Sequence, residues 1–157
     1  MADITIEILH ESLDPAAETG ALAGRDASAG GLATFVGQVR DEPGLKALEL
    51  EYYPGVTKQA LQRIAQTAAR RWMIARAVIK HRVGRMTLGE PIVFVAAAAA
   101  HRREALDAVG YMIDMLKTEA PFWKRVHTDT GAHWVEAVDA DRDAADFWME
   151  EIASEDA

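Results

Sequence analysis

The 157-residue chain contains no cysteine. It can therefore form neither a disulfide nor a thiolate metal site, and it cannot use a cysteine nucleophile. A chain without cysteine fits a cytoplasmic protein, which is the location we expect. If its chemistry involves sulfur, another molecule has to supply the sulfur atom.

Long apolar runs and an excess of positive charge are also missing. No stretch reaches the 18 or so apolar residues of a membrane span, and the opening MADITIEILHE lacks the basic start and apolar run of a signal peptide. The formal net charge of −8 argues against nucleic acid or an anionic membrane as the main partner, because both favour a basic surface. Any site that binds an anion must therefore be local.

Several catalytic motifs are absent as well. The chain has no GxxxxGK[ST] and no HExxH, and its serines lie outside any nucleophile-elbow pattern. The histidines show no metal-ligand spacing, so we expect no metal. They are His10, His81, His101, His127 and His133. A metal site at the last two, which flank a predicted turn, is the weaker alternative.

The length and the 50% hydrophobic composition suffice for one substantial core. We expect a single domain over residues 1–157, with a flexible tail from about residue 152. Alternation and helical periodicity predict both strands and helices, in an α+β or α/β arrangement. Strands are predicted at 4–8, 31–40, 45–53, 75–86, 91–100, 122–127 and 133–138, and helices from 15 onward, at 54–72, at 101–117 and, short, at 143–153.

Turn residues refine this prediction at three places. The DEPG turn at 41–44 suggests that the strands on either side form a hairpin, and the turn at 128–131 suggests a second hairpin near the C-terminus. Gly37, inside a strand, indicates a bulge or a close approach of another backbone segment. Pro121 ends the long second helix.

Basic residues are the candidates for a local anion site. His101, Arg102 and Arg103 open a helix, where free backbone N–H groups already attract an anion and extra positive charge is unfavourable for the helix itself. Arg40 at a strand end and Lys117 in a last helical turn are, taken singly, compatible with ordinary solvated positions. The cluster at 101–103 could also pair with nearby acids.

The segment LKTEAPFWKR, residues 116–125, sets Lys117 and Lys124 on either side of Phe122 and Trp123. A lysine that is partly desolvated and close to a second cation has a lowered pKa, and its neutral amine can act as a nucleophile or a base. The alternative is that the aromatic residues pack the hairpin while both lysines extend into solvent.

Helix length restricts how these groups combine. A helix over 101–117 rises about 24 Å, so His101 and Lys117 cannot share one small-molecule site within a chain. Either there are two sites, or a symmetric dimer brings the start of one helix towards the end of its mate.

Six segments are informative when they are taken together: TFVGQVR (34–40), LEYYPG (50–55), HRVG (81–84), AHR (100–102), LKTEAPFWKR (116–125) and WVEA (134–137). Together they resemble the large, catalytic subunit family of molybdopterin synthase. Their order and approximate spacing match that family over nearly the whole chain. The resemblance implies an α+β fold, an α/β hammerhead with an additional antiparallel β-sheet.

The resemblance also implies a function and partners. The chain would be a sulfurtransferase that converts cyclic pyranopterin monophosphate to molybdopterin in molybdenum cofactor biosynthesis. The sulfur would come from the thiocarboxylated C-terminal glycine of a small ubiquitin-like carrier subunit that ends in Gly-Gly. Two carriers would bind a homodimer, forming a heterotetramer, with no cofactor of the chain's own. The alternative is a non-catalytic module that only docks the carrier tail.

The resemblance assigns the site residues. It implies that Lys117 and Lys124 are catalytic. Substrate contacts would come from Phe35, Arg40, His101, Arg102, Met112 and Arg125, with His101 and Arg102 reaching the substrate's phosphate from the neighbouring subunit. Two places depart from the family pattern: the turn after Arg40 is shorter, and Val138 stands where some members carry an arginine.

Overall fold

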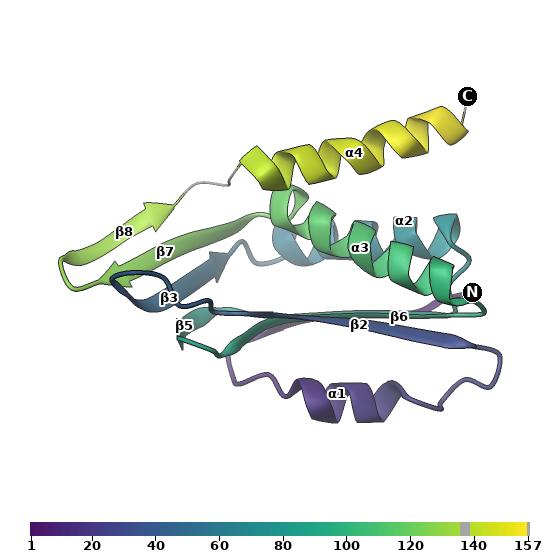
Figure 1. Cartoon of the computed structure of the whole chain (residues 1–157), viewed down its shortest axis with the longest axis horizontal. Helices are drawn as coiled ribbons and strands as arrows, with labels where there is room; N and C mark the ends of the chain where they lie inside the picture. The colour runs from purple at the N-terminus through teal and green to yellow at the C-terminus, as the bar shows by residue number, and fades with distance from the viewer. Residues whose placement is uncertain (136–138, 157) are drawn as a thin grey trace.

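The structure, a computed structural model, describes residues 1–135 and 139–156, which form two sheets and the helices packed on them (Figure 1). The elements in chain order are β1 (Asp3–Leu9), α1 (Pro15–Leu22), β2 (Gly31–Gln38), β3 (Leu45–Tyr52), α2 (Val56–Arg71), β4 (Arg76–Arg82), β5 (Gly84–Thr87), β6 (Pro91–Ala99), α3 (Arg102–Glu119), β7 (Phe122–Thr128), β8 (Gly131–Val135) and α4 (Asp139–Glu155).

The main sheet has the strand order β1-β4-β6-β2, in which only β1 and β4 run parallel. Helices α2 and α3 cover one face, α4 lies over α3, and α1 covers the other face (Figure 1). Strand β6 is therefore buried on both sides. Its Val93 and Val95 pack towards α2 and α3, and Phe94 and Ala96 pack towards α1. A strand covered on both faces reads as a continuous apolar run, which explains PIVFVAAAA.

Helix α1 begins at Pro15, as predicted. The Asp14 side chain accepts a hydrogen bond from the Ala17 N–H (3.1 Å), and a proline in the first helical turn needs no backbone donor. Lys80 on β4 forms an ion pair with Glu18 (2.8 Å), which joins the helix to the main sheet.

Helices α2 and α3 confirm the two long predicted helices, with one change in their buried faces. Val56 and Leu106 recur at helical spacing with the other apolar residues of these helices, which would predict them on the buried faces, but they are 56% and 51% exposed. A repeat of four residues advances about 40° beyond a full turn each time, so Val56 lies far around the helix from Ala68. Thr57 is fully buried in its place.

The predicted hairpin between β2 and β3 is wrong. β2 pairs with β6, whereas β3 pairs with β5 and β7 in the second sheet. The chain leaves the main sheet after a register shift between Gly37 and Gln38, and the buried Val39 already belongs to the core of the second sheet. This irregularity at Gly37 agrees with the first of the two alternatives predicted there, a bulge or a close backbone approach. A Cβ there would also lie 2.8 Å from Cγ1 of Val93.

The second sheet has the order β5-β3-β7-β8 and is antiparallel throughout. It extends beyond one end of the main sheet, and β7 and β8 form the predicted C-terminal hairpin (Figure 1). This sheet confirms the α+β class with an additional antiparallel sheet. The predicted strand over 75–86 divides into β4 and β5.

Helix α4 is longer than the short closing helix that the sequence predicts. It packs on α3 through the buried Ala145, and the Trp148 indole N–H donates a hydrogen bond to Asp114 (2.8 Å). It continues through Glu155, beyond residue 152, where a flexible tail is predicted. The mobility of that tail stays a prediction.

Candidate active site

Lys117 and Lys124 flank the short connection between α3 and β7, at the junction of the two sheets. Lys117 is in the last turn of α3, a position where the helix dipole favours a cation. Ala120 and Pro121 then stop the helix, and β7 begins at Phe122. Both lysine side chains are exposed in this chain. Of the two alternatives that the sequence left open, the structure of the single chain favours lysines extended into solvent.

Strand alternation places the two aromatic residues of this segment on opposite faces of β7. Phe122 packs into the core together with Leu48 and Leu50, and Lys124, opposite Leu50 in the register, lies on the same face. Trp123 lies on the other face, where its ring meets Tyr53 edge-on, with centroids 4.6 Å apart. Trp123 therefore does not cover Lys124.

A buried histidine lies beneath the connection between the lysines. The His81 ring stacks on Phe122, with centroids 3.9 Å apart and planes 19° from parallel, and its Nδ1 is 2.9 Å from the carbonyl oxygen of Arg82. Burial lowers the pKa of His81 to about 4. The hydrogen bond to Arg82 opposes this shift, and the nearby positive charge of Lys117 adds to it. His81 is thus neutral at pH 7 and close to Lys117.

Arg40 approaches the same place from the end of β2. Its guanidinium donates to Glu42 (2.7 Å), and this hydrogen bond, with the positive charge of Arg40, holds the pKa of Glu42 below its usual value. Lys124 contributes a smaller attraction in the same direction. Arg40, Lys117 and Lys124 therefore gather three positive charges around the junction of the sheets, although the whole chain is acidic.

His101 and Arg102 lie at the opposite end of α3 from Lys117. His101 precedes the helix in an extended conformation and its side chain makes no capping hydrogen bond, and both residues are exposed. The unbroken helix separates them from Lys117 by about 24 Å, as its rise per residue requires. Phe35 is 39% exposed. It lies in the middle of β2, the strand of the main sheet that pairs with β6.

Met112 and Arg125 are not placed with the exposed cations. The Met112 side chain is fully buried in the main core, so in this chain it packs rather than lines an open surface. Arg125 is on the face of β7 opposite to Lys124, with its guanidinium carbon 5.6 Å from the centroid of the Trp134 ring. Their contact with a substrate stays a prediction. Val138 lies outside the described residues.

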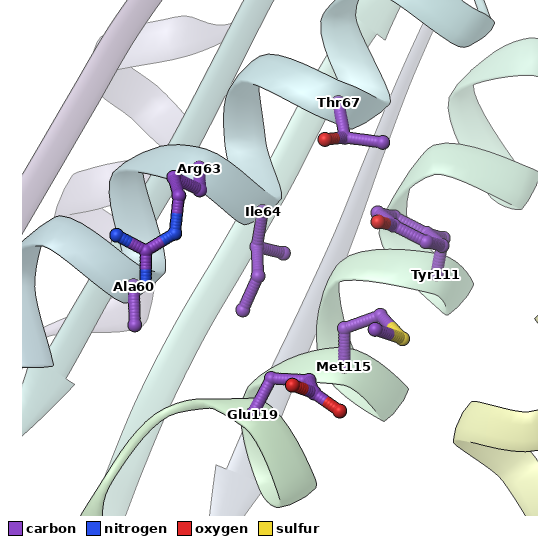
Figure 2. Close-up of a pocket in the computed structure, with 7 residues that line it drawn as sticks. All are labelled: Ala60, Arg63, Ile64, Thr67, Tyr111, Met115 and Glu119. Atoms are coloured by element: carbon purple, nitrogen blue, oxygen red, sulfur yellow. The ribbon is translucent and has the colours of Figure 1, made fainter. Parts of the chain in front are cut away.

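The pocket lined by α2 and α3 is a separate feature (Figure 2). It has a volume of about 170 Å³ and is bordered by Arg63, Thr67, Tyr111, Met115 and Glu119, among others. Residues two apart on a helix point about 200° from each other, so Lys117 projects away from the stripe formed by Met115 and Glu119. Neither Lys117 nor Lys124 is among the residues that line this pocket.

Sequence reasoning missed two residues that support this site. Thr57 is fully buried at the start of α2, and its hydroxyl donates a hydrogen bond to the Pro121 carbonyl (2.9 Å). The sequence did contain a signal for His81, because this residue opens HRVG, one of the segments that carry the family resemblance. Thr57, two positions after LEYYPG, had only its proximity to such a segment.

The described residues contain neither a metal-ligand cluster nor a membrane-spanning helix. Within residues 1–135 and 139–156, no group of three or more histidine, aspartate or glutamate side chains is arranged to hold a metal ion. No helix in this part of the chain combines the length and the apolar character needed to cross a membrane.

Comparison with known proteins identifies the family. A family model described as "MoaE protein" matches residues 8–119. The chain belongs to the MoaE family. It is 44% identical over 152 residues to the molybdopterin synthase catalytic subunit of Pseudomonas aeruginosa, covering 94% of this chain and 100% of that protein. The corresponding subunit of Caulobacter vibrioides is 50% identical over 130 residues, covering 82% and 86% of the two chains.

A solved structure agrees. The molybdopterin cofactor biosynthesis protein E of Burkholderia multivorans superposes with a TM-score of 0.79 at 43% identity, covering 93% of this chain and 97% of that one. The predicted resemblance to this family is therefore confirmed, and the chain is an enzyme subunit.

Proposed function

We propose that this chain transfers sulfur to cyclic pyranopterin monophosphate, producing molybdopterin, and that it takes the sulfur from the thiocarboxylated C-terminus of a small ubiquitin-like carrier. Membership of the MoaE family and the names of its relatives support this reaction. The structural observation that carries the proposal is the gathering of Arg40, Lys117 and Lys124 at one exposed junction of an acidic molecule.

The chemistry calls for such a group of cations. The carrier terminus and the phosphorylated pterin are both anions, and fixed positive charges attract them and stabilise negative charge that develops during transfer. A lysine amine that has lost its proton can also act as a base or a nucleophile. The sulfur arrives on the carrier, which agrees with a chain that has no cysteine.

Because both lysines are exposed, the bound partners must also exclude water from the site. Electrostatic attraction between unit charges is weak in water and much stronger where water is excluded. Because both Lys117 and Lys124 are exposed in the part of the chain that the structure describes, the inserted carrier tail has to displace water from them. The site is complete only in the assembly, a homodimer that binds two carriers as a heterotetramer in the cytoplasm.

The alternative function is assembly without catalysis, in which the same surface only docks a carrier tail. The two lysines favour the enzyme, because a docking groove depends on apolar and hydrogen-bonding contacts more than on paired amines.

A direct assay tests the proposal. The purified chain is mixed with thiocarboxylated carrier and the cyclic pterin, and molybdopterin is measured by mass spectrometry. We expect product only when all three are present, and none with a carrier that lacks its terminal Gly-Gly. Binding of the carrier without any product would refute the sulfurtransferase and support the docking function.

A further inference from the structure

We infer that His81 is a positioning residue for the two lysines: its imidazole, with the Thr57 hydroxyl, fixes the connection from Ala120 to Phe122 and so sets where Lys117 and Lys124 stand relative to each other. This inference rests on the proposed function, because it names a group that this reaction needs. His81 itself is buried and does not reach the exposed ends of the lysines.

The location of His81 is rigid. It is the sixth residue of β4, a central strand of the main sheet, where it pairs with Ile8 on β1 and Val93 on β6. Its side chain is 5% exposed. A side chain held between two neighbouring strands moves little, so a group that stacks on it is fixed relative to the main sheet.

Two contacts hold the connection between the lysines, one on each side of the bond that joins Pro121 to Phe122. The Phe122 ring stacks on His81 at a centroid distance of 3.9 Å. The Pro121 carbonyl accepts a hydrogen bond from the Thr57 hydroxyl, whose oxygen in turn accepts one from the Tyr53 N–H (3.0 Å). The end of α3 and the start of β7 are thereby tied to β4 and to α2.

His81 is neutral at pH 7, as a buried ring that stacks on Phe122 should be. A backbone carbonyl can only accept, so Nδ1 carries the hydrogen that meets the Arg82 oxygen, and Nε2 is left without one in the neutral ring. Burial and the charge of Lys117 keep the pKa of the ring low, at about 4. A neutral ring stacks on Phe122 without adding a fourth positive charge beside Arg40, Lys117 and Lys124.

Positioning matters here because the lysines have few other restraints. Both are long and exposed, so the backbone from which they project decides how closely their amines can approach one substrate. A displacement of about 1 Å in a catalytic group can reduce a rate on the order of 100-fold. Loss of the His81 stack would loosen this backbone while leaving both lysines present.

The test compares variants in the complete assay with carrier and cyclic pterin. His81→Ala removes the stack, His81→Phe keeps a stacking ring without its nitrogens, and Thr57→Val removes only the hydroxyl bond to Pro121. Leu13→Ala is the matched control, since Leu13 is buried on the opposite face of the main sheet, in the cluster with Val78 and Phe94. Circular dichroism and thermal melts establish a temperature at which every variant is folded.

We expect His81→Ala to lower kcat at least about 10-fold while the KM for the pterin and the Kd for the carrier change less than about 3-fold, the pattern of a group that acts only in the reacting state. Thr57→Val should lower kcat several-fold and His81→Phe should recover most of the wild-type rate. Leu13→Ala should melt earlier with unchanged kcat.

Normal kcat in folded His81→Ala, while Lys117→Ala is inactive, would overturn the positioning inference and leave the proposed function intact. A kcat loss in Leu13→Ala equal to that of His81→Ala would also overturn it, because the effect would then be general loosening. If His81→Ala does not fold, normal kcat in Thr57→Val rejects the inference. Absence of product from the wild-type chain refutes the proposed function and the inference together.

Discussion

Lys117 lies in a helix and Lys124 lies in a strand, and this difference affects the role that each can have in the reaction. Lys117 ends a helix beside the neutral His81, whereas Lys124 projects from a strand towards Glu42 and Arg40. Lys124 thus lies with the residues that attract an anion, and Lys117 lies next to a buried neutral ring.

Substitution of each lysine tests this difference. Lys117→Ala should abolish molybdopterin formation while carrier affinity stays within a few-fold, because many contacts hold the tail and one amine does chemistry. Lys124→Ala should lower the rate on the order of 100-fold through lost charge stabilisation. Lys46→Ala, at an exposed lysine of β3 that pairs with Asp129, is the control and should leave kcat unchanged. Near-normal turnover of Lys117→Ala would remove that residue from the mechanism.

His81 also gives the fold a pH dependence that can be measured without substrate. Its pKa is about 4 in the folded chain and about 6.5 when unfolded, so between these values the unfolded chain binds more protons. The stability is therefore fully present above pH 6.5 and falls as the pH decreases towards 4. The loss is on the order of 3 kcal/mol.

Urea unfolding of the wild type and of His81→Phe at pH 7 and pH 4 isolates this contribution. Carboxylates that titrate near pH 4 affect both proteins alike, and phenylalanine has no proton to gain. We expect the wild type to lose more unfolding free energy than His81→Phe over this interval. Equal losses would mean that His81 is not buried in its neutral form.

At the scale of single elements, the start of β2 depends on one glycine that touches the start of α3. A Cβ at Gly30 would lie 2.4 Å from the backbone oxygen of Ala100, the residue that leads into His101 and Arg102. The backbone there has to shift to admit any side chain, so Gly30→Ala should lower the unfolding free energy by about 1–3 kcal/mol.

Gly20→Ala provides the matched control for this prediction. Gly20 is an exposed residue of α1, and a Cβ there would meet nothing within 4 Å. Alanine favours a helix over glycine, so this variant should gain about 0.5–1 kcal/mol. Chemical denaturation of both variants measures the contrast, and a Gly30→Ala protein as stable as wild type would show that the close approach is absent.

Elements with a clear local signal were predictable from the sequence, but the pairing of strands that lie far apart in the chain was not. Asp14 before Pro15 marks a helix start through contacts within a few residues, and the turn at 128–131 joins strands that do pair. The DEPG turn has the same local appearance. The chain nevertheless crosses there from one sheet to the other, and Val39 is already buried with Leu48 and Leu50 of the second sheet. Local turn chemistry cannot distinguish these outcomes.

The residues of the candidate site were likewise only partly predictable from the sequence. Family resemblance predicted Lys117, Lys124 and Arg40 as site residues, and their roles stay a prediction. In the structure Arg40 and Lys124 are both close enough to influence Glu42, and Lys117 is close enough to influence His81. His81 contacts Phe122, which is 41 positions later in the chain, and Thr57 contacts Pro121, which is 64 positions later. No periodicity or motif spacing encodes contacts over such separations. Met112 shows the converse: its assignment came from the resemblance alone, and its side chain is in the core.

For the whole molecule, the layout of α3 sets a geometric condition on the site. The helix runs along the main sheet from Arg102 at one end to Lys117 at the end nearest the second sheet (Figure 1). A pterin phosphate that contacts both the lysines and Arg102 requires these groups within roughly 10 Å, whereas the helix keeps Arg102 about 23 Å from Lys117. A second copy of the chain, related by a two-fold axis, can satisfy both conditions.

Subunit exchange tests this shared site. Lys117→Ala and Arg102→Ala should each be inactive alone. When the two proteins exchange subunits, every heterodimer contains one pocket with both defects and one intact pocket. Random exchange makes about half of all dimers mixed, so activity should return to about a quarter of the wild-type value per site. Control mixtures of each variant with itself should stay inactive. If mass spectrometry confirms heterodimers and the mixture remains inactive, each chain completes its own site, and His101 and Arg102 serve a separate anion site or the helix start alone.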